Sequence, residues 1–315
     1  MQYFPFKVPQ QQYLRTPVQR RNLEVQKWHE AAWNLGVAPL LWIITPTEIR
    51  LYDCYSSPRR DEGGAGTIPL ESFALDDVKR LRALDAMCGR LATETGAFWS
   101  SEIGKRIDRR FRVDRELLAE ISALEERLTA LPPARDLNLR HHDEATASRD
   151  FAQRLIGRCI FTWYLLDRGL AKQFLPKHLP ADLSNLFKTT SVAFSLFAWL
   201  RQTFNGDLFP MDNPGAERQR LSSAHLALIR DFAEGRSLNP KALGQGRLFR
   251  FRFDAIPIDL VSSIYQQFAR SSAQNDARLQ GLHYTPVEIV HLTLDPVFEQ
   301  LPKTARIIDP ACGSG

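Results

Sequence analysis

Apolar residues near helical spacing dominate the first part of the chain. Between residues 17 and 35 they recur about every third or fourth position, which predicts a helix that begins at Pro17. Two short apolar runs follow, at 40–44 and 48–52, and the second alternates like a half-buried strand. Residues 1–75 are therefore expected to form a small α/β module.

Beyond residue 75 the apolar spacing becomes helical almost throughout. The segments that carry this pattern are 76–91, 114–131, 143–170, 191–204, 221–234 and 258–270. The sequence thus predicts a helical domain over residues 76–270 and the start of a further domain at 271–315. The fold class is expected to be mainly α-helical with a small N-terminal α/β module. Four tryptophans are expected in the core, namely Trp28, Trp33, Trp42 and Trp199.

Composition narrows the class of protein. The chain has 315 residues of which 44% are hydrophobic, enough to bury a sizeable core. It contains no apolar run of eighteen residues and no leader pattern at its first residues, so neither a membrane span nor a secretory signal is predicted. The four cysteines are scattered without metal-ligand spacing, which favours free thiols in the cytoplasm and no metal.

A dense basic run is the clearest charge feature. The net charge is +5 and the pI about 9.1, which is compatible with a nucleic-acid partner. The candidate DNA-binding residues are Lys105, Arg106, Arg109, Arg110 and Arg112, with Phe111 among them and Arg115 following. Their charges would neutralise phosphates of double-stranded DNA. The alternative is a solvated helix face.

The C-terminal end carries the most specific motif. An expected short strand at 306–308 runs into Asp309-Pro-Ala-Cys-Gly-Ser-Gly315, where the glycines allow a tight turn and the carboxylate can hold an amine or hydroxyl. Upstream, Gly281-Leu-His-Tyr-Thr-Pro286 starts a helix, with Thr285 as its cap and Glu288 completing a capping box. Its buried stripe is expected to comprise Ile289, Val290, Leu294 and Val297.

The order of these two motifs resembles the S-adenosylmethionine-binding entry of N6-adenine DNA methyltransferases. The likeness is strongest to the large fused enzymes of restriction-modification and phage-defence systems. It extends more loosely to segments 154–169, 204–210 and 251–268. In the last of these segments the family often has an acidic residue after the tyrosine, whereas this chain has Gln266 after Tyr265. The resemblance implies a Rossmann-like fold that is entered but not completed. It also implies double-stranded DNA as partner and the possibility of partner subunits in a defence system.

The resemblance also assigns cofactor contacts. It implies that Tyr284, Thr285 and Pro286 pack beside the methionine end of S-adenosylmethionine in the full-length protein. The residues expected to line the same ligand are Asp309, near its amino group, and Ala311, Gly313 and Gly315. No Asn-Pro-Pro motif, which these enzymes use to hold the flipped adenine, occurs in the sequence. No catalytic residue is therefore assigned, and the chain is expected to be an inactive N-terminal fragment.

Two other functions stay open from the sequence. One is a helical DNA- or partner-binding module without catalysis. The other is a nuclease, which needs an acidic residue and an Asp/Glu-x-Lys triplet to hold magnesium. Glu24 and Lys27 have the wrong spacing on a predicted helix, and Glu48-Ile-Arg50 ends in arginine, so a nuclease is disfavoured. The pair His141-His142 with Asp143 fits a loop or cap better than a metal site.

Overall fold

The structure is a computed structural model, and it describes most of the chain with several gaps. The described residues are 17–58, 67–134, 141–204, 214–236, 238, 251–257, 260, 261, 264, 285, 287–302 and 304–308. The chain divides into two compact units, residues 1–116 and 117–315. The domain limits drawn from the sequence stay predictions, and the two units are described separately below.

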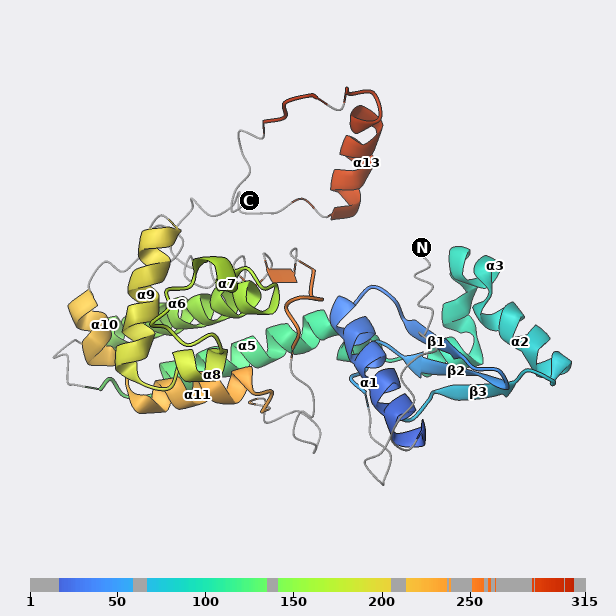
Figure 1. Ribbon diagram of the computed structural model, residues 1–315, viewed down its shortest axis with the longest axis horizontal. Coiled ribbons are helices and arrows are strands. Elements are labelled where there is room, and N and C mark those ends of the chain that lie inside the picture. The colour runs from blue at the N-terminus through green and yellow to red at the C-terminus, as the bar shows by residue number, and fades with distance from the viewer. Residues whose placement is uncertain are drawn as a thin grey trace. The chain divides into compact units, whose positions relative to one another are not determined.

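A three-stranded antiparallel sheet organises the first unit. Helix α1 (Pro17–Leu35) precedes strands β1 (Leu40–Ile44), β2 (Glu48–Asp53) and β3 (Glu71–Ala74), which pair in the order β1-β2-β3. Figure 1 shows α1 and α2 (Val78–Cys88), which contact β1 and β3 respectively. The predicted helix and the first two strands are confirmed, whereas β3 was not predicted.

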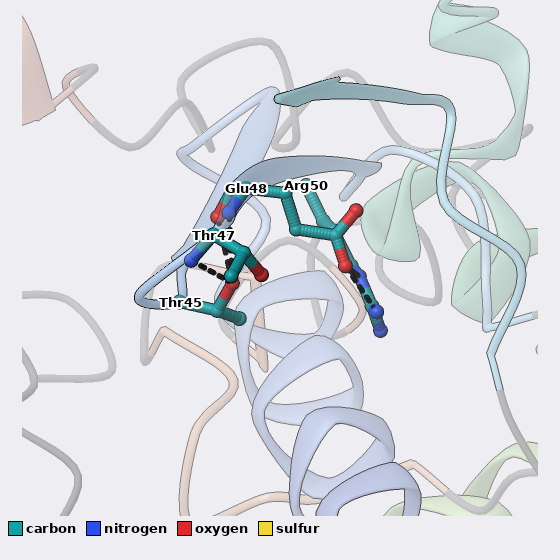
Figure 2. A network of polar contacts seen from close by, with 4 residues as sticks. All are labelled: Thr45, Thr47, Glu48 and Arg50. Carbon is teal, nitrogen blue, oxygen red and sulfur yellow. Dashed lines mark hydrogen bonds and ion pairs between the residues drawn. The ribbon is translucent and has the colours of Figure 1, made fainter. Parts of the chain in front are cut away.

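The turn between β1 and β2 is held by a threonine side chain. Thr45 Oγ1 accepts hydrogen bonds from the backbone N–H groups of Thr47 and Glu48, at 3.4 and 3.0 Å. Figure 2 shows this turn together with the ion pair between Glu48 and Arg50 on β2. A hydroxyl that satisfies backbone donors in this way is a recurrent means of stabilising short turns.

Short helices cover one face of the sheet. After α2 come α3 (Arg90–Glu94), η1 (Ala97–Ser100), α4 (Glu102–Lys105) and η2 (Arg109–Phe111). Asp77 caps α2, since its carboxylate accepts from the N–H of Arg80 at 3.0 Å. The core that joins these helices to the sheet comprises Leu51, Tyr55, Phe73, Leu84, Cys88, Phe98, Ile103 and Ile107.

Gly36 links the end of α1 to the start of α5 (Val113–Thr129). Helix α1 ends directly before this glycine, whose φ of 71° is a conformation that favours glycine. A Cβ at this position would meet Val113 Cγ1 at 2.9 Å, and Val113 is buried. Only a residue without a side chain therefore fits the left-handed turn and the close approach together.

The second unit is helical. Its elements are the rest of α5, then α6 (His141–Asp167), α7 (Ala171–Phe174), α8 (Leu183–Leu186), α9 (Thr190–Thr203), α10 (Pro214–Arg220) and α11 (Ser223–Ala233). The long predicted helices are confirmed, although the one expected at 258–270 lies mostly outside the described residues. The middle of α6 is the centre of the core, with Leu155, Ile156, Cys159, Ile160 and Trp163 all fully buried.

The tryptophans that were predicted to lie in the core differ in their burial. Trp33 and Trp199 are buried, as predicted. Trp42 is 37% exposed, so its assignment to the core is wrong. It lies on β1, which ends the strand order and pairs only with β2 in the described residues, and an edge strand has fewer neighbours to cover its side chains.

Buried ionic groups fasten α10 to α6. The guanidinium of Arg158 is 1% exposed and makes two bonds to the Glu217 carboxylate, at 2.7 and 3.1 Å. It also lies over the ring of Phe197 on α9, with its central carbon 4.6 Å from the ring centroid. Arg220, nearly as buried, reaches Glu144 at 2.6 Å. These charges are compensated by direct pairing.

His225 is a buried histidine that caps α11. The side chain of Ser222 accepts from the N–H of His225, and His225 Nδ1 accepts from the N–H of Ser222, so the two form a capping box. Burial, assisted by the charge of Arg220, lowers the pKa of His225 to about 4. The histidine is therefore neutral in the folded protein at neutral pH.

We expect this histidine to make folding sensitive to acid. Its pKa is lower in the folded protein than its usual 6.5, so the unfolded chain binds the proton more readily. The stabilisation is complete above pH 6.5 and is lost as pH falls toward 4, by about 1.4 kcal/mol per pH unit within that window. Urea unfolding at several pH values measures the slope. His225→Gln, which can keep the capping box but cannot titrate, should flatten it, and an equal slope in both proteins would contradict the assignment.

The C-terminal part of the described chain differs from the prediction. Helix α13 (Val287–Phe298) is present where a helix was expected. However, Ile289 is 50% exposed, Leu294 37% and Val297 50%, so the stripe expected to be buried is not. Residues 306–308 form no strand, and Ile307 and Ile308 are 66% and 86% exposed. The physical reason is that an apolar strand or stripe is buried only where other elements pack against it.

Candidate functional site

The predicted cofactor residues are mostly outside the described part of the chain. Thr285 is described, and it lies exposed two residues before α13 begins. Tyr284, Pro286, Asp309, Ala311, Gly313 and Gly315 lie outside the described residues, as does the Glu288 side chain of the predicted capping box. The assignment of these residues to S-adenosylmethionine stays a prediction.

The segment that leads toward this motif is tied to the helical unit. Phe251 and Phe253 are fully buried, and the ring centroids of Phe253 and Trp163 lie 4.9 Å apart. The backbone N–H of Phe253 donates to the Asp167 carboxylate at 3.0 Å. The Arg168 side chain donates to the backbone carbonyl of Phe253 at 3.2 Å. Two segments that the sequence singled out separately, around 164–169 and 251–257, are therefore in direct contact.

The basic run is described in full and does not lie on one helix. Lys105 ends α4, Arg106 caps it, Arg109 and Arg110 form η2, and Arg112 stands just before α5. We call Lys105, Arg106, Arg109, Arg110, Arg112 and Arg115 the α4–η2 basic surface. Its backbone is anchored from beneath, since Trp33 Nε1 on α1 donates to the carbonyl of Phe111 at 3.2 Å.

The arginines of this surface differ in their partners. Arg106 pairs with Glu71 on β3 at 2.8 Å and also donates to the carbonyl of Leu70. Arg110 pairs with Asp108 at 2.6 Å, and Arg112 with Asp114 at 3.1 Å. The hydrogen bonds from Arg110 lower the pKa of the Asp108 carboxyl.

Aromatic rings lie beneath two of these guanidinium groups. The rings of Tyr55 and Trp99 are stacked, with centroids 6.0 Å apart and planes 19° apart, and Phe98 packs edge-on against Trp99 at 4.9 Å. The central carbon of Arg109 lies 3.7 Å from the Trp99 centroid, and that of Arg112 lies 5.1 Å from the Tyr55 centroid. Tyr55, Trp99 and Glu71 were not predicted from the sequence as part of this surface. In the sequence, the aromatic pair Phe98 and Trp99 shortly before the basic run is the one indication that aromatic rings lie close to these arginines.

The residues considered for a nuclease do not form a metal site in the described part of the chain. The Glu48 carboxylate is paired with Arg50, so its charge is already compensated. Glu24 and Lys27 lie on α1, as predicted. In the described part of the chain, no group of three or more His, Cys, Asp or Glu residues is placed to hold a metal ion. The side chains of His141, His142 and Asp143 lie outside that part.

None of the described helices is both long and apolar enough to cross a membrane.

Comparison with known proteins finds a likeness at the C-terminal end of the chain. Residues 257–315 match the family model of the N-6 DNA methylases, described as N-6 DNA Methylase. The matched segment begins at Pro257, the last residue of the segment 251–257 that packs on α6, and it includes α13 and the Asp-Pro-Ala-Cys-Gly-Ser-Gly motif. The predicted likeness to N6-adenine DNA methyltransferases is confirmed for this segment. Neither the curated proteins nor the solved structures contain a match to the chain.

Proposed function

We propose that this chain supplies the N-terminal, helical part of an S-adenosylmethionine-dependent adenine-N6 DNA methyltransferase and the entry to its cofactor site. The observation that carries the proposal is the match of residues 257–315 to the N-6 DNA methylases. In this reaction the sulfonium methyl group moves to N6 of an adenine in duplex DNA. S-adenosylhomocysteine remains, and the amino group loses a proton.

The cofactor roles are assigned to seven residues. Tyr284, Thr285 and Pro286 pack against the methionine end of S-adenosylmethionine, and Asp309 accepts from its amino group. Ala311, Gly313 and Gly315 let the backbone approach the ligand closely, because small residues leave room there. An acidic residue at the end of a strand and a glycine turn suit this ligand, which carries an amine and a nucleoside.

Exposed apolar side chains at the C-terminal end are a second observation that supports the proposal. One face of α13 and the pair Ile307 and Ile308 are exposed in the described structure. In a Rossmann-like fold a helix and an apolar strand in this order pack against a parallel sheet. The Asn-Pro-Pro motif does not occur in the 315 residues, so we assign no catalytic residue to them.

The biological setting is part of the proposal. The motif order resembles that of fused restriction-modification and phage-defence enzymes, so we assign the protein to such a system, acting on double-stranded DNA in the cytoplasm. In such a system, the protein would have partner subunits that belong to the same defence system.

Ultraviolet cross-linking to methyl-labelled S-adenosylmethionine tests the cofactor assignment. The product of the complete gene is irradiated with the labelled cofactor, digested, and mapped by mass spectrometry. We expect the label in peptides covering 281–315, and excess unlabelled S-adenosylmethionine should remove it. Label confined to peptides of the first 250 residues, or no saturable label in the folded protein, would contradict the proposal.

A further inference from the structure

Two guanidinium groups rest on a pair of stacked rings in the α4–η2 basic surface. Arg109 lies over Trp99, and Arg112 over Tyr55. Trp99 is itself fixed between Tyr55 and Phe98, and Phe98 is buried in the core of the first unit. The rings are therefore a rigid support, and the position of Arg109 is set by the core.

Arg109 differs from its neighbours in its charge partners. Arg106, Arg110 and Arg112 each pair with a carboxylate. Arg109 makes no ion pair within the described part of the chain, and its guanidinium group lies over the face of Trp99. A guanidinium stacked on a ring keeps its N–H groups in a plane parallel to that ring, where they remain available to an outside acceptor.

We propose that Arg109, oriented by Trp99, is the main phosphate contact of this chain on double-stranded DNA. Lys105 and Arg115 flank it and add charge, whereas Arg106 and Arg112 are positioning residues that hold α4 and η2 in place. This inference rests on the proposed function, which makes DNA the substrate. Trp99 is likewise a positioning residue, because it acts on DNA only through Arg109.

The chemistry of the surface favours phosphate over other acceptors. A guanidinium presents two parallel N–H groups that match two phosphate oxygens. Asp108 and Asp114 are occupied by Arg110 and Arg112, so they do not compete for Arg109. Glu102, in the first turn of α4, is an exposed acidic residue close to this surface in the sequence, and its negative charge weakens the attraction for phosphate. Contacts of this kind bind DNA without sequence preference.

The test compares Arg109 with its immediate neighbour. Arg109→Ala and Arg110→Ala remove the same group from adjacent exposed positions of η2, but Arg110 is engaged by Asp108. Fluorescence anisotropy with the 315-residue chain and two 30-base-pair duplexes of unrelated sequence gives the affinities. We expect Arg109→Ala to weaken binding about tenfold on both duplexes, since a bond to a charged group is lost, and Arg110→Ala to weaken it less than about twofold.

Salt dependence and a double mutant sharpen the test. The slope of log affinity against log salt should fall by about 1 for Arg109→Ala, because one phosphate contact is lost. Trp99→Leu should weaken binding by less than Arg109→Ala, and the double mutant should bind no worse than Arg109→Ala alone. Circular dichroism and thermal unfolding confirm that each variant is folded.

Several outcomes overturn the inference. They are unchanged affinity for Arg109→Ala, equal losses for Arg109→Ala and Arg110→Ala, and additive losses for Trp99 and Arg109. Failure here is separable from failure of the proposed function. If S-adenosylmethionine still cross-links within 281–315 while Arg109→Ala binds DNA normally, only the DNA surface is wrong. If the label maps elsewhere while the DNA result holds, only the cofactor assignment is wrong.

Discussion

Replacing Glu217 by alanine is expected to lower the free energy of unfolding of the second unit by about 3–5 kcal/mol. Glu217 is 6% exposed and receives two bonds from Arg158, whose guanidinium is 1% exposed. Without the carboxylate, Arg158 would stay buried and would lose both of these charge-assisted bonds. Charge burial of this kind costs far more than the loss of one exposed pair. Urea unfolding followed by circular dichroism measures the change.

The matched control is an exposed pair of the same chemistry. Arg90 and Glu94 are 83% and 54% exposed and pair at 2.7 Å on α3. Glu94→Ala should change stability by less than about 0.5 kcal/mol, because solvent screens such pairs. The double variant Arg158→Met with Glu217→Leu removes both charges and should recover most of the loss. A loss below 1 kcal/mol for Glu217→Ala, or a double variant as unstable as the single one, would refute the account.

The long helices could be predicted because periodicity is a local property. Helix α1 and α5 follow directly from apolar spacing, and Asp77 and Gly36 mark boundaries by their own chemistry. Strand β3 could not be predicted in this way. It has four residues, only Phe73 is buried, and it exists because β2 offers it a partner. A strand of that length is decided by tertiary pairing rather than by its own sequence.

The basic residues of the candidate site could be predicted from the sequence, but the residues that they contact could not. The basic run can be read from the sequence, and so can its affinity for phosphate. Two of its contacts could not be predicted from the sequence. Arg106 pairs with Glu71, 35 residues away, and Arg109 lies on Trp99. Both contacts depend on how strand β3 and the short helices pack together. Conversely, Ile289 and Leu294 are apolar at helical spacing, yet they are exposed where no described element covers them.

Asp309→Ala is expected to lower the methylation rate at subsaturating S-adenosylmethionine by roughly tenfold to a hundredfold. The proposed bond from the cofactor's amino group to the carboxylate is charge-assisted, and such bonds contribute about 1.5–3 kcal/mol. Asp309→Asn keeps the shape and one acceptor, so its loss should be smaller. Cys312→Ala, in the same loop but without an assigned contact, is the matched control and should change the rate less than about twofold. Equal rates for Asp309→Ala and Cys312→Ala would remove Asp309 from the cofactor site.

Residues 257–315 match the N-6 DNA methylases, and we propose that they open an adenine-N6 methyltransferase. The most direct measurement is mass spectrometry of nucleosides from duplex DNA incubated with the product of the complete gene and S-adenosylmethionine. We expect N6-methyladenine to form only when the cofactor is present, and we expect Asp309→Ala to reduce its amount strongly. Methylation of cytosine instead, or no methylated base from a folded protein that binds the same DNA, would contradict the claim.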